Sequence, residues 1–287
     1  MRARVRGDAG GDGCGGCGMM YTLHCGDCLD IMPTLAAGSV DAIITDLPYG
    51  TTACAWDTII PFVPMWEQVK RVLKPNGVFV TTASQPFTSA LVMSNLEWYR
   101  YDYVWNKLKA ANFLFGNNQP LKKTEYIHVF YGMQPTYNPI KTKNTNGRQK
   151  SGRKGIGNTI HQHLPNAPKR SMAGKNYEDD MLLPDNIIEI SKPSNPIHPT
   201  QKPVALYEYL IRTYTNPGET VLDFCFGSCT TGVAALRTQR AFIGIERELD
   251  YFEIGQKRMK ETALQPPLFV DITPSEPQPV QASFYTP

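Results

Sequence analysis

Apolar residues in the first third of the chain alternate between a continuous run and a helical spacing. The run Val40 to Thr45 is β-rich and apolar, which is typical of a strand buried on both faces of a parallel sheet. From Phe62 to Leu73 apolar residues recur at helical spacing, and Pro75-Asn76-Gly77 is expected to end that helix. A second strand is predicted over Gly77 to Thr82. This order predicts a right-handed crossover between parallel strands.

The last third of the chain shows the same alternation. Three helices and two strands are predicted there, which extends the mostly parallel α/β sheet. The helices span Val204 to Thr213, Thr230 to Leu236 and Leu249 to Leu264, and the strands span Thr220 to Phe224 and Ala241 to Ile245.

The segment from Gln134 to about Pro184 has another character. It is rich in Asn, Gly, Lys, Pro and Gln and shows little periodicity, so we expect an insert there. The glycine-rich residues 1–18 and the proline-rich residues 265–287 are expected to be a disordered leader and tail. The α/β body then consists of residues 19–133 and 185–264.

Positive charge is concentrated around the insert. The formal net charge is only +3, but nine Lys or Arg and no acid lie between Tyr126 and Tyr177, which leaves −6 elsewhere. A basic segment on an acidic body is expected for an element that contacts phosphates, with a solvated basic loop as the alternative. Lys150, Arg153 and Lys154 lie within it.

The seven cysteines are expected to be reduced thiols of a cytoplasmic protein. No apolar run is long enough to span a bilayer, and glycine follows the N-terminal arginines where a signal peptide would be apolar. The pairs Cys14-x2-Cys17 and Cys25-x2-Cys28 have the spacing of zinc ligands, so a structural zinc site is an alternative to weigh.

Two motifs follow predicted strands. After the strand ending at Asp223, a glycine turn with Gly227 opens a helix, and Glu246 ends the next strand, 19 residues beyond Gly227. In nucleotide-binding units such a turn approaches the ligand and such an acid binds ribose hydroxyls. An ordinary strand-to-helix turn is the alternative reading of this spacing.

The second motif is Asp46-Leu47-Pro48-Tyr49, directly after the first strand. It places a carboxylate and an aromatic ring at a carboxyl strand end, where open α/β sheets bind ligands. Pro48 fixes φ and so orients Tyr49. By its turn chemistry alone, the tetrapeptide is equally consistent with a plain turn.

With these motifs the chain resembles the amino-methylating DNA methyltransferases that carry an Asp/Ser/Asn-Pro-Pro-Tyr motif. It is most similar to their β-type arrangement, in which that motif precedes the target-recognition insert and the cofactor motif comes last. The resemblance runs from about Met20 to Ala263. Besides the two motifs it rests on residues 25–29, 39–45, 105–107, 198–203, 221–224 and 242–246, which occur in the family's order.

The resemblance implies a Rossmann-like S-adenosylmethionine-dependent methyltransferase fold, with helices on both sheet faces and a circularly permuted motif order. Residues 19–133 would be its catalytic half, 134–184 its target-recognition insert and 185–264 its cofactor half. Its substrate would be double-stranded DNA, without a metal, in the cytoplasm and bound to the nucleoid. A homodimer and a cognate restriction endonuclease stay open as partners. Because Cys25 and Cys28 belong to the resemblance, it disfavours zinc.

The resemblance also assigns roles to individual residues. Asp46 and the Pro48 carbonyl would accept hydrogen bonds from the amino group of a flipped-out base, and Tyr49 would stack on that base. Glu246 would bind the ribose of the cofactor, and Lys202 would pair with its carboxylate. The other implied cofactor-binding residues are Asp27, Thr200, Gln201, Asp223, Phe224, Gly227, Ser228 and Thr230; Lys150, Arg153 and Lys154 would bind DNA.

The chain departs from the family pattern in three places. Leu47 replaces the first proline of the tetrapeptide, and Cys229 replaces the second glycine of the cofactor loop. If that glycine needs a positive φ, Cys229 introduces strain. Cys225 stands where the family commonly has phenylalanine, so either Phe224 or Phe226 is expected to face the cofactor.

Several readings stay open. Asp in the first tetrapeptide position favours adenine N6 over cytosine N4 as the methylated atom. RNA and protein-glutamine methyltransferases use the same tetrapeptide logic, but with Asn first and the cofactor motif before it. A DNA-binding protein with a decayed methyltransferase fold is the alternative that Cys229 suggests, and a zinc-ribbon interaction module is another.

Overall fold

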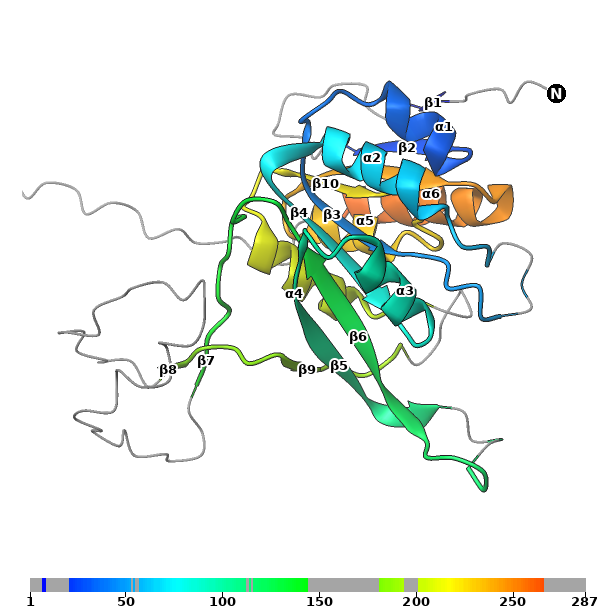
Figure 1. Cartoon of the computed structure of the whole chain (residues 1–287). Helices are drawn as coiled ribbons and strands as arrows, with labels where there is room; N and C mark the ends of the chain where they lie inside the picture. The colour runs from blue at the N-terminus through cyan, green and yellow to red at the C-terminus, as the bar shows by residue number, and fades with distance from the viewer. Residues whose placement is uncertain are drawn as a thin grey trace, which may run out of the picture. The chain divides into compact units, whose positions relative to one another are not determined.

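A nine-stranded sheet forms the centre of the chain (Figure 1). The computed structural model describes residues 7–8, 21–52, 54, 57–111, 114, 116–143, 181–193 and 201–265. The sheet order is β1-β2-β11-β10-β3-β4-β6-β5-β9. Its strands are β1 (Gly7–Asp8), β2 (Tyr21–Cys25), β3 (Val40–Asp46), β4 (Leu73–Ala83), β5 (Tyr99–Ala111), β6 (Lys122–Phe130), β9 (Ile187–Glu189), β10 (Thr220–Asp223) and β11 (Ala241–Glu246).

The strands β2, β11, β10, β3 and β4 run parallel to one another. This confirms the parallel arrangement that the apolar runs predicted. Strand β10, from the end of the chain, lies beside β3, from its beginning, with Val221 opposite Ala42 and Leu222 opposite Ile43. The two sequence halves therefore form one sheet, and the loops after β3 and β10 share one edge.

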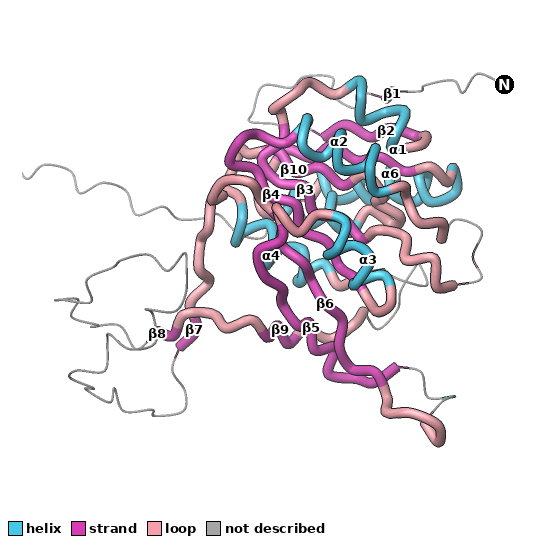
Figure 2. Tube along the Cα trace, viewed as in Figure 1, coloured by secondary structure: helices cyan, strands magenta, loops and turns pink. Residues whose placement is uncertain are grey.

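Helices cover both faces of this sheet (Figure 2). Successive residues of a strand point to opposite faces, so Ile44 packs against one layer of helices and Ile43 against the other. This double burial explains the continuous apolar runs. One layer contains α4 (Val204–Tyr214), α5 (Thr230–Arg237) and α6 (Leu249–Ala263); the other contains α1 (Cys28–Ile31), η1 (Met32–Thr34), α2 (Phe62–Val72) and α3 (Phe87–Ser94).

The far edge of the sheet is antiparallel. Strands β5 and β6 form a long hairpin that projects beyond the helices (Figure 1), and β6 pairs with β4. The apolar pattern did not predict this hairpin, because Trp105 and Lys107 are both buried on β5 and a buried lysine breaks the expected alternation. The hairpin matters for function because β6 carries Glu125 to the candidate site.

Strand β4 begins earlier than the sequence predicted. Leu73 pairs with Val40 directly after α2, and regular pairing resumes only where Val78 lies opposite Ala42. Pro75-Asn76-Gly77 therefore forms an irregularity within β4 instead of a separate turn before it, because proline has no N–H to give to the ladder.

The chain divides into two units, one formed by residues 1–138 and 187–287 and the other by residues 139–186. In the smaller unit β7 (Thr142–Lys143) pairs antiparallel with β8 (Met181–Leu182). Of the expected leader, Gly7 and Asp8 pair with β2, and the rest lies outside the described residues, as does the tail from 266. Within the described part of the chain, no helix combines the length and apolarity that a membrane span requires.

Candidate active site

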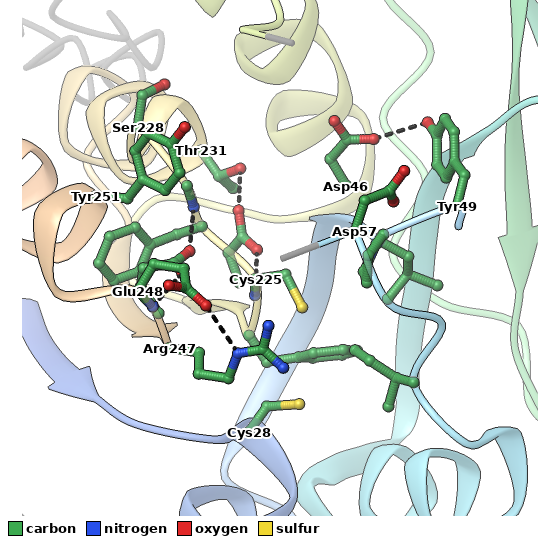
Figure 3. Close-up of a pocket in the computed structure, with 18 of the residues that line it drawn as sticks. Cys28, Asp46, Tyr49, Asp57, Cys225, Ser228, Thr231, Arg247, Glu248 and Tyr251 are labelled. Carbon is green, nitrogen blue, oxygen red and sulfur yellow. Dashed lines mark hydrogen bonds and ion pairs between the residues drawn. The ribbon is translucent and has the colours of Figure 1, made fainter. Parts of the chain in front are cut away.

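A cavity of about 430 Å³ opens at the carboxyl ends of the parallel strands (Figure 3). Residues after β2, β3, β10 and β11 line it, which is the position where open α/β sheets bind ligands. The volume lies within the range of small-molecule sites. Asp46 and Tyr49 line this cavity together with Gly227 and Glu246, so both sequence motifs share one site.

Asp46 is the last residue of β3, and both of its carboxylate oxygens are engaged. The Oδ1 atom accepts hydrogen bonds from the Tyr49 hydroxyl at 2.8 Å and from the Thr82 hydroxyl. The Oδ2 atom accepts one from the Lys202 ammonium at 2.6 Å. Thr82 lies opposite Asp46 in the β3–β4 register, so the sheet itself orients the carboxylate.

The Tyr49 ring lies between an aromatic ring and a cation. It stacks on Phe87 with ring centroids 5.3 Å apart and an interplanar angle of 22°. The Lys202 Nζ atom lies 5.7 Å from the Tyr49 ring centroid. Burial, together with the negative charge of Asp46, raises the pKa of Tyr49 well above its usual value, so its hydroxyl stays protonated and donates to Asp46. Leu47, the departure from the tetrapeptide pattern, is buried in the core beside this turn.

A buried chain of alternating charges continues from Asp46. The Lys202 ammonium also lies 3.5 Å from Glu125 Oε2, and Lys107 Nζ donates to Glu125 Oε1 at 2.8 Å. The side chains of Lys107 and Lys202 are only 2% and 8% exposed. Burial opposes the charged form of Lys202, but the carboxylates of Asp46 and Glu125 outweigh burial and raise its pKa.

The loop after the tetrapeptide is held by Asp57. Its carboxylate accepts hydrogen bonds from the backbone N–H groups of Gly50, Thr51 and Thr52 at 2.7–2.9 Å. The Thr52 hydroxyl donates to the same carboxylate at 2.8 Å. Burial opposes ionisation, yet these four bonds outweigh it and lower the pKa of Asp57. Asp57 thus fixes one wall of the cavity while ionised.

Asp223 holds the loop that follows β10. It is 2% exposed and accepts hydrogen bonds from the hydroxyls of Thr45 (2.7 Å) and Thr231 (2.6 Å) and from Cys225 N–H (3.1 Å). Burial raises the pKa of Asp223 to about 7, although these bonds favour the carboxylate. Its oxygens therefore join β3, β10 and α5 to one another.

Glu246 shapes the same loop from the next strand. Its carboxylate accepts hydrogen bonds from Gly227 N–H and from Glu248 N–H, both at 2.8 Å. The two backbone hydrogen bonds favour the ionised form, but burial outweighs them and raises the pKa of Glu246. Gly227 has φ 50°, a conformation that favours glycine, so its N–H reaches the carboxylate without steric cost.

Cys229 adopts the left-handed conformation that its family position suggested, with φ 58° and ψ 39°. The positive φ on which the expected strain depends is therefore present. The side chain is fully buried and its Sγ atom lies against Gly232, so the neighbouring glycine leaves the space that the thiol fills. Arg258 of α6 secures this loop by donating to the Ser228 carbonyl and, at 3.3 Å, to Thr230 Oγ1.

Both phenylalanines beside Cys225 are core residues. Phe224 stacks on Phe79 with centroids 6.3 Å apart, and Phe226 packs against Phe252 at 6.2 Å. Each ring is at most 4% exposed, although both border the cavity. Between them Cys225 opens to the cavity opposite Cys28 (Figure 3), so sulfur occupies the position where the family commonly has an aromatic ring.

The remaining predicted residues divide into two groups. Asp27, Gln201, Lys202, Ser228 and Thr230 line the cavity, and the Asp27 carboxylate also caps α1 by accepting from Leu29 N–H at 2.8 Å. Thr200 and the three candidate DNA-binding residues lie outside the described residues, as do Cys14 and Cys17. Among the residues that the structure describes, no group of three or more His, Cys, Asp or Glu is placed to hold a metal ion.

Sequence reasoning assigned no role in the site to Glu125, Lys107, Asp57 or Arg258. Glu125 and Lys107 lie on the hairpin that the apolar pattern did not predict, and their pairing is visible only once β5 and β6 are aligned. Asp57 carried a weak signal, because an acid seven residues after Gly50 can cap a turn. Arg258 is an ordinary surface residue by its helical position and gave no signal.

Residues 40–257 match the model of a protein family described as DNA methylase, N6/N4 type. Among curated relatives, YubD of Escherichia coli (strain K12) is 29% identical over 245 residues, covering 82% of this chain and 88% of YubD. The type II methyltransferase M.HinfI of Haemophilus influenzae is 26% identical over 279 residues, covering 86% of this chain and 70% of that protein. Among solved structures, the M1.HpyAVI–S-adenosylmethionine complex has a TM-score of 0.56 at 25% identity, covering 83% of this chain and all of that one.

The left-handed backbone at Cys229 predicts that glycine is better tolerated there than alanine, the reverse of their usual order in a helix or strand. Cys229→Ala keeps a Cβ at φ 58° and also loses the buried sulfur, whereas Cys229→Gly removes the steric cost. We expect the glycine variant to be more stable than the alanine variant by about 1 kcal/mol. Urea denaturation of both variants measures this difference, and an alanine variant of equal or greater stability would show that the backbone there is unstrained.

The raised pKa of Asp223 predicts a pH-dependent stability. The folded protein keeps a proton on Asp223 up to a pKa of about 7, while the unfolded chain releases it near 4, so folding is favoured at acidic pH and this contribution is lost as pH rises from 4 to 7. Relative to Asp223→Asn, the free energy of unfolding should fall by up to about 1.4 kcal/mol per pH unit across this window. Urea denaturation of both proteins between pH 4.5 and 7.5 tests this, and parallel curves would contradict it.

Proposed function

The chain belongs to the N6/N4 family of DNA methylases, and from this premise we propose that it transfers a methyl group from S-adenosylmethionine to the exocyclic amino group of a flipped-out base in double-stranded DNA. One observation carries the proposal. The Asp46 carboxylate at the end of β3 and the Gly227–Glu246 pair after β10 and β11 line the same cavity. The carboxylate that would accept the amino group of the base and the loop that would bind the cofactor thus line the same cavity.

The cofactor half of the cavity suits a nucleoside with a charged tail. Glu246 presents a buried carboxylate beside a glycine whose backbone conformation leaves room for a ligand, which is the arrangement that binds ribose hydroxyls. Asp27, Gln201, Ser228 and Thr230 add polar groups to the same lining. The solved complex of M1.HpyAVI contains S-adenosylmethionine, which supports this cofactor for the present chain.

The catalytic half suits a planar base. Tyr49 offers a ring already supported by Phe87, so an extruded base would recover on that ring part of the stacking it loses from the duplex. Asp46 and the Pro48 carbonyl would accept the two amino N–H bonds and direct the nitrogen lone pair out of conjugation. When bound, S-adenosylmethionine supplies a methyl carbon that its sulfonium already activates.

The work of the chain is then to position the amine and to stabilise charge. As the amino nitrogen gains a methyl carbon, positive charge would develop on it while it still keeps both of its protons. The Asp46 carboxylate would stabilise this charge and would then accept one proton along the N–H hydrogen bond it already holds. Tyr49 and Thr82 keep the carboxylate oriented through its Oδ1 atom.

Adenine N6 is the proposed target, because Asp leads the tetrapeptide; cytosine N4 is the second candidate on the same geometry. A decayed, purely DNA-binding protein is disfavoured by the site itself. The left-handed Cys229 is accommodated by Gly232, and the carboxylates of Asp46, Asp223 and Glu246 are all held in hydrogen-bonded positions.

Two substitutions should separate methyl transfer from cofactor binding. Asp46→Ala removes the acceptor for the amino group, so transfer of labelled methyl to unmethylated genomic DNA should fall below a few per cent of wild type while cofactor affinity is retained. Glu246→Ala is the matched control at the other end of the cavity: it should weaken cofactor binding by about 1.5–3 kcal/mol, the contribution of charge-assisted hydrogen bonds, and leave DNA binding intact. Calorimetry measures cofactor affinity and filter binding measures DNA binding. Substantial methyl transfer by Asp46→Ala would refute the role of Asp46 as the acceptor for the amino group.

The basic insert is the proposed DNA-reading element. Neutralising Lys150, Arg153 and Lys154 together should weaken DNA binding and reduce its dependence on the logarithm of salt concentration by up to about 0.9 per lost phosphate contact. Cofactor affinity should stay unchanged, because the cofactor residues lie on the α/β body. A triple variant with the salt dependence of wild type would place phosphate binding elsewhere, with residues 107–123 as the next region to test.

A further inference from the structure

Building on the proposed function, we propose that Lys202 is a placeholder for the amino group of the target base, and that Glu125 is the carboxylate that receives Lys202 when the base enters. Neither residue would touch the transferred methyl group. Both would act as positioning residues by controlling access to Asp46. The sequence resemblance, in contrast, directs Lys202 to the carboxylate of the cofactor.

The ammonium of Lys202 already has the surroundings that the target amino nitrogen needs. It donates to Asp46 Oδ2 at 2.6 Å and lies 5.7 Å from the centroid of the Tyr49 ring, on which the base would stack. The other Asp46 oxygen is taken by Tyr49 and Thr82. Asp46 Oδ2 is therefore the oxygen that the amino group of the base must use, and the Lys202 ammonium must leave this oxygen before the base can bind.

Glu125 offers a second position for the ammonium. Its Oε2 atom is buried and forms an ion pair with Lys202 Nζ at 3.5 Å, but it accepts no regular hydrogen bond among the described residues. Its Oε1 atom is held by Lys107 at 2.8 Å. A buried carboxylate oxygen gains from a close hydrogen bond, so Oε2 is poised to bind the ammonium more closely once the ammonium leaves Asp46.

The exchange keeps the buried charges balanced. With the cavity empty, Lys202 neutralises Asp46; with a base bound, Lys202 would pair with Glu125 and the amino group would bond to Asp46 Oδ2. Without Glu125, base entry would leave an unpaired ammonium in a site that is 8% exposed, which costs far more than a surface charge. Lys192 also lines the cavity, and burial together with repulsion from Lys107 lowers its pKa.

A double-mutant cycle on the full-length protein tests the exchange. Labelled S-adenosylmethionine and unmethylated genomic DNA give kcat and KM for each variant. Glu125→Gln should lower kcat/KM for DNA by about tenfold or more, because Lys202 then stays on Asp46. Lys202→Met should lower KM for DNA, and Glu125→Gln in that background should change kcat/KM by less than about twofold.

The controls separate this exchange from a structural role and from the proposed function. Lys74→Met removes a lysine that pairs at 2.7 Å with Asp41, near the opposite end of β3, and should leave kcat and KM unchanged. Equal effects of Glu125→Gln with and without Lys202 would overturn the exchange alone, as would a loss of cofactor affinity in Lys202→Met. Absence of methyl transfer by the wild-type protein would instead overturn the proposed function.

A second variant covers a failure of Glu125→Gln to fold, since that change also removes the partner of Lys107. Lys202→Arg keeps the charge but presents a planar, fork-shaped donor that holds a carboxylate through two bonds. It should lower kcat/KM for DNA by about tenfold with unchanged cofactor affinity. Turnover equal to wild type would overturn the exchange.

Discussion

The carboxylate of Asp46, at the carboxyl end of the buried strand β3, is the constraint on which the rest of the site depends. A partly buried carboxylate must be satisfied by donors, and the fold supplies them from three segments: Tyr49 from the following turn, Thr82 from β4, and Lys202 from the segment before α4. Lys202 brings Glu125 and so the β5–β6 hairpin into the same network. The hydrogen-bond requirements of this one side chain thus bring together the residues of the proposed base-binding site.

The proposed cofactor side of the cavity is also built around buried carboxylates. Asp223 and Glu246 end adjacent parallel strands, and both accept hydrogen bonds from the segment after β10: Asp223 from Cys225 N–H and the Thr231 hydroxyl, Glu246 from Gly227 N–H. Gly227 and Cys229, which have positive φ, lie within this segment. The hydrogen bonds to these two buried carboxylates order the loop in the absence of a ligand. Less conformational entropy is then lost when a ligand binds.

The sequence predicted those parts of the molecule that depend on local periodicity and on strand ends. Val40 to Thr45 and Ala241 to Ile245 were continuous apolar runs because both sheet faces are covered, and Asp46, Gly227 and Glu246 follow directly from such runs. The β5–β6 hairpin was not predictable in this way, since Lys107 is buried where periodicity expects an apolar residue. The pairing of Lys202 with Asp46 joins residues 156 positions apart, so only the folded sheet shows it.

The most direct test of this account is the chemical identity of the product. The full-length protein is incubated with methyl-labelled S-adenosylmethionine and unmethylated double-stranded DNA, and the digested nucleosides are separated by mass spectrometry. The account predicts label on an exocyclic amino group, in N6-methyldeoxyadenosine. Label in N4-methyldeoxycytidine would correct the base and keep the mechanism. Label on a ring carbon, or no label at all, would contradict the claim that Asp46 positions an exocyclic amino group for methylation.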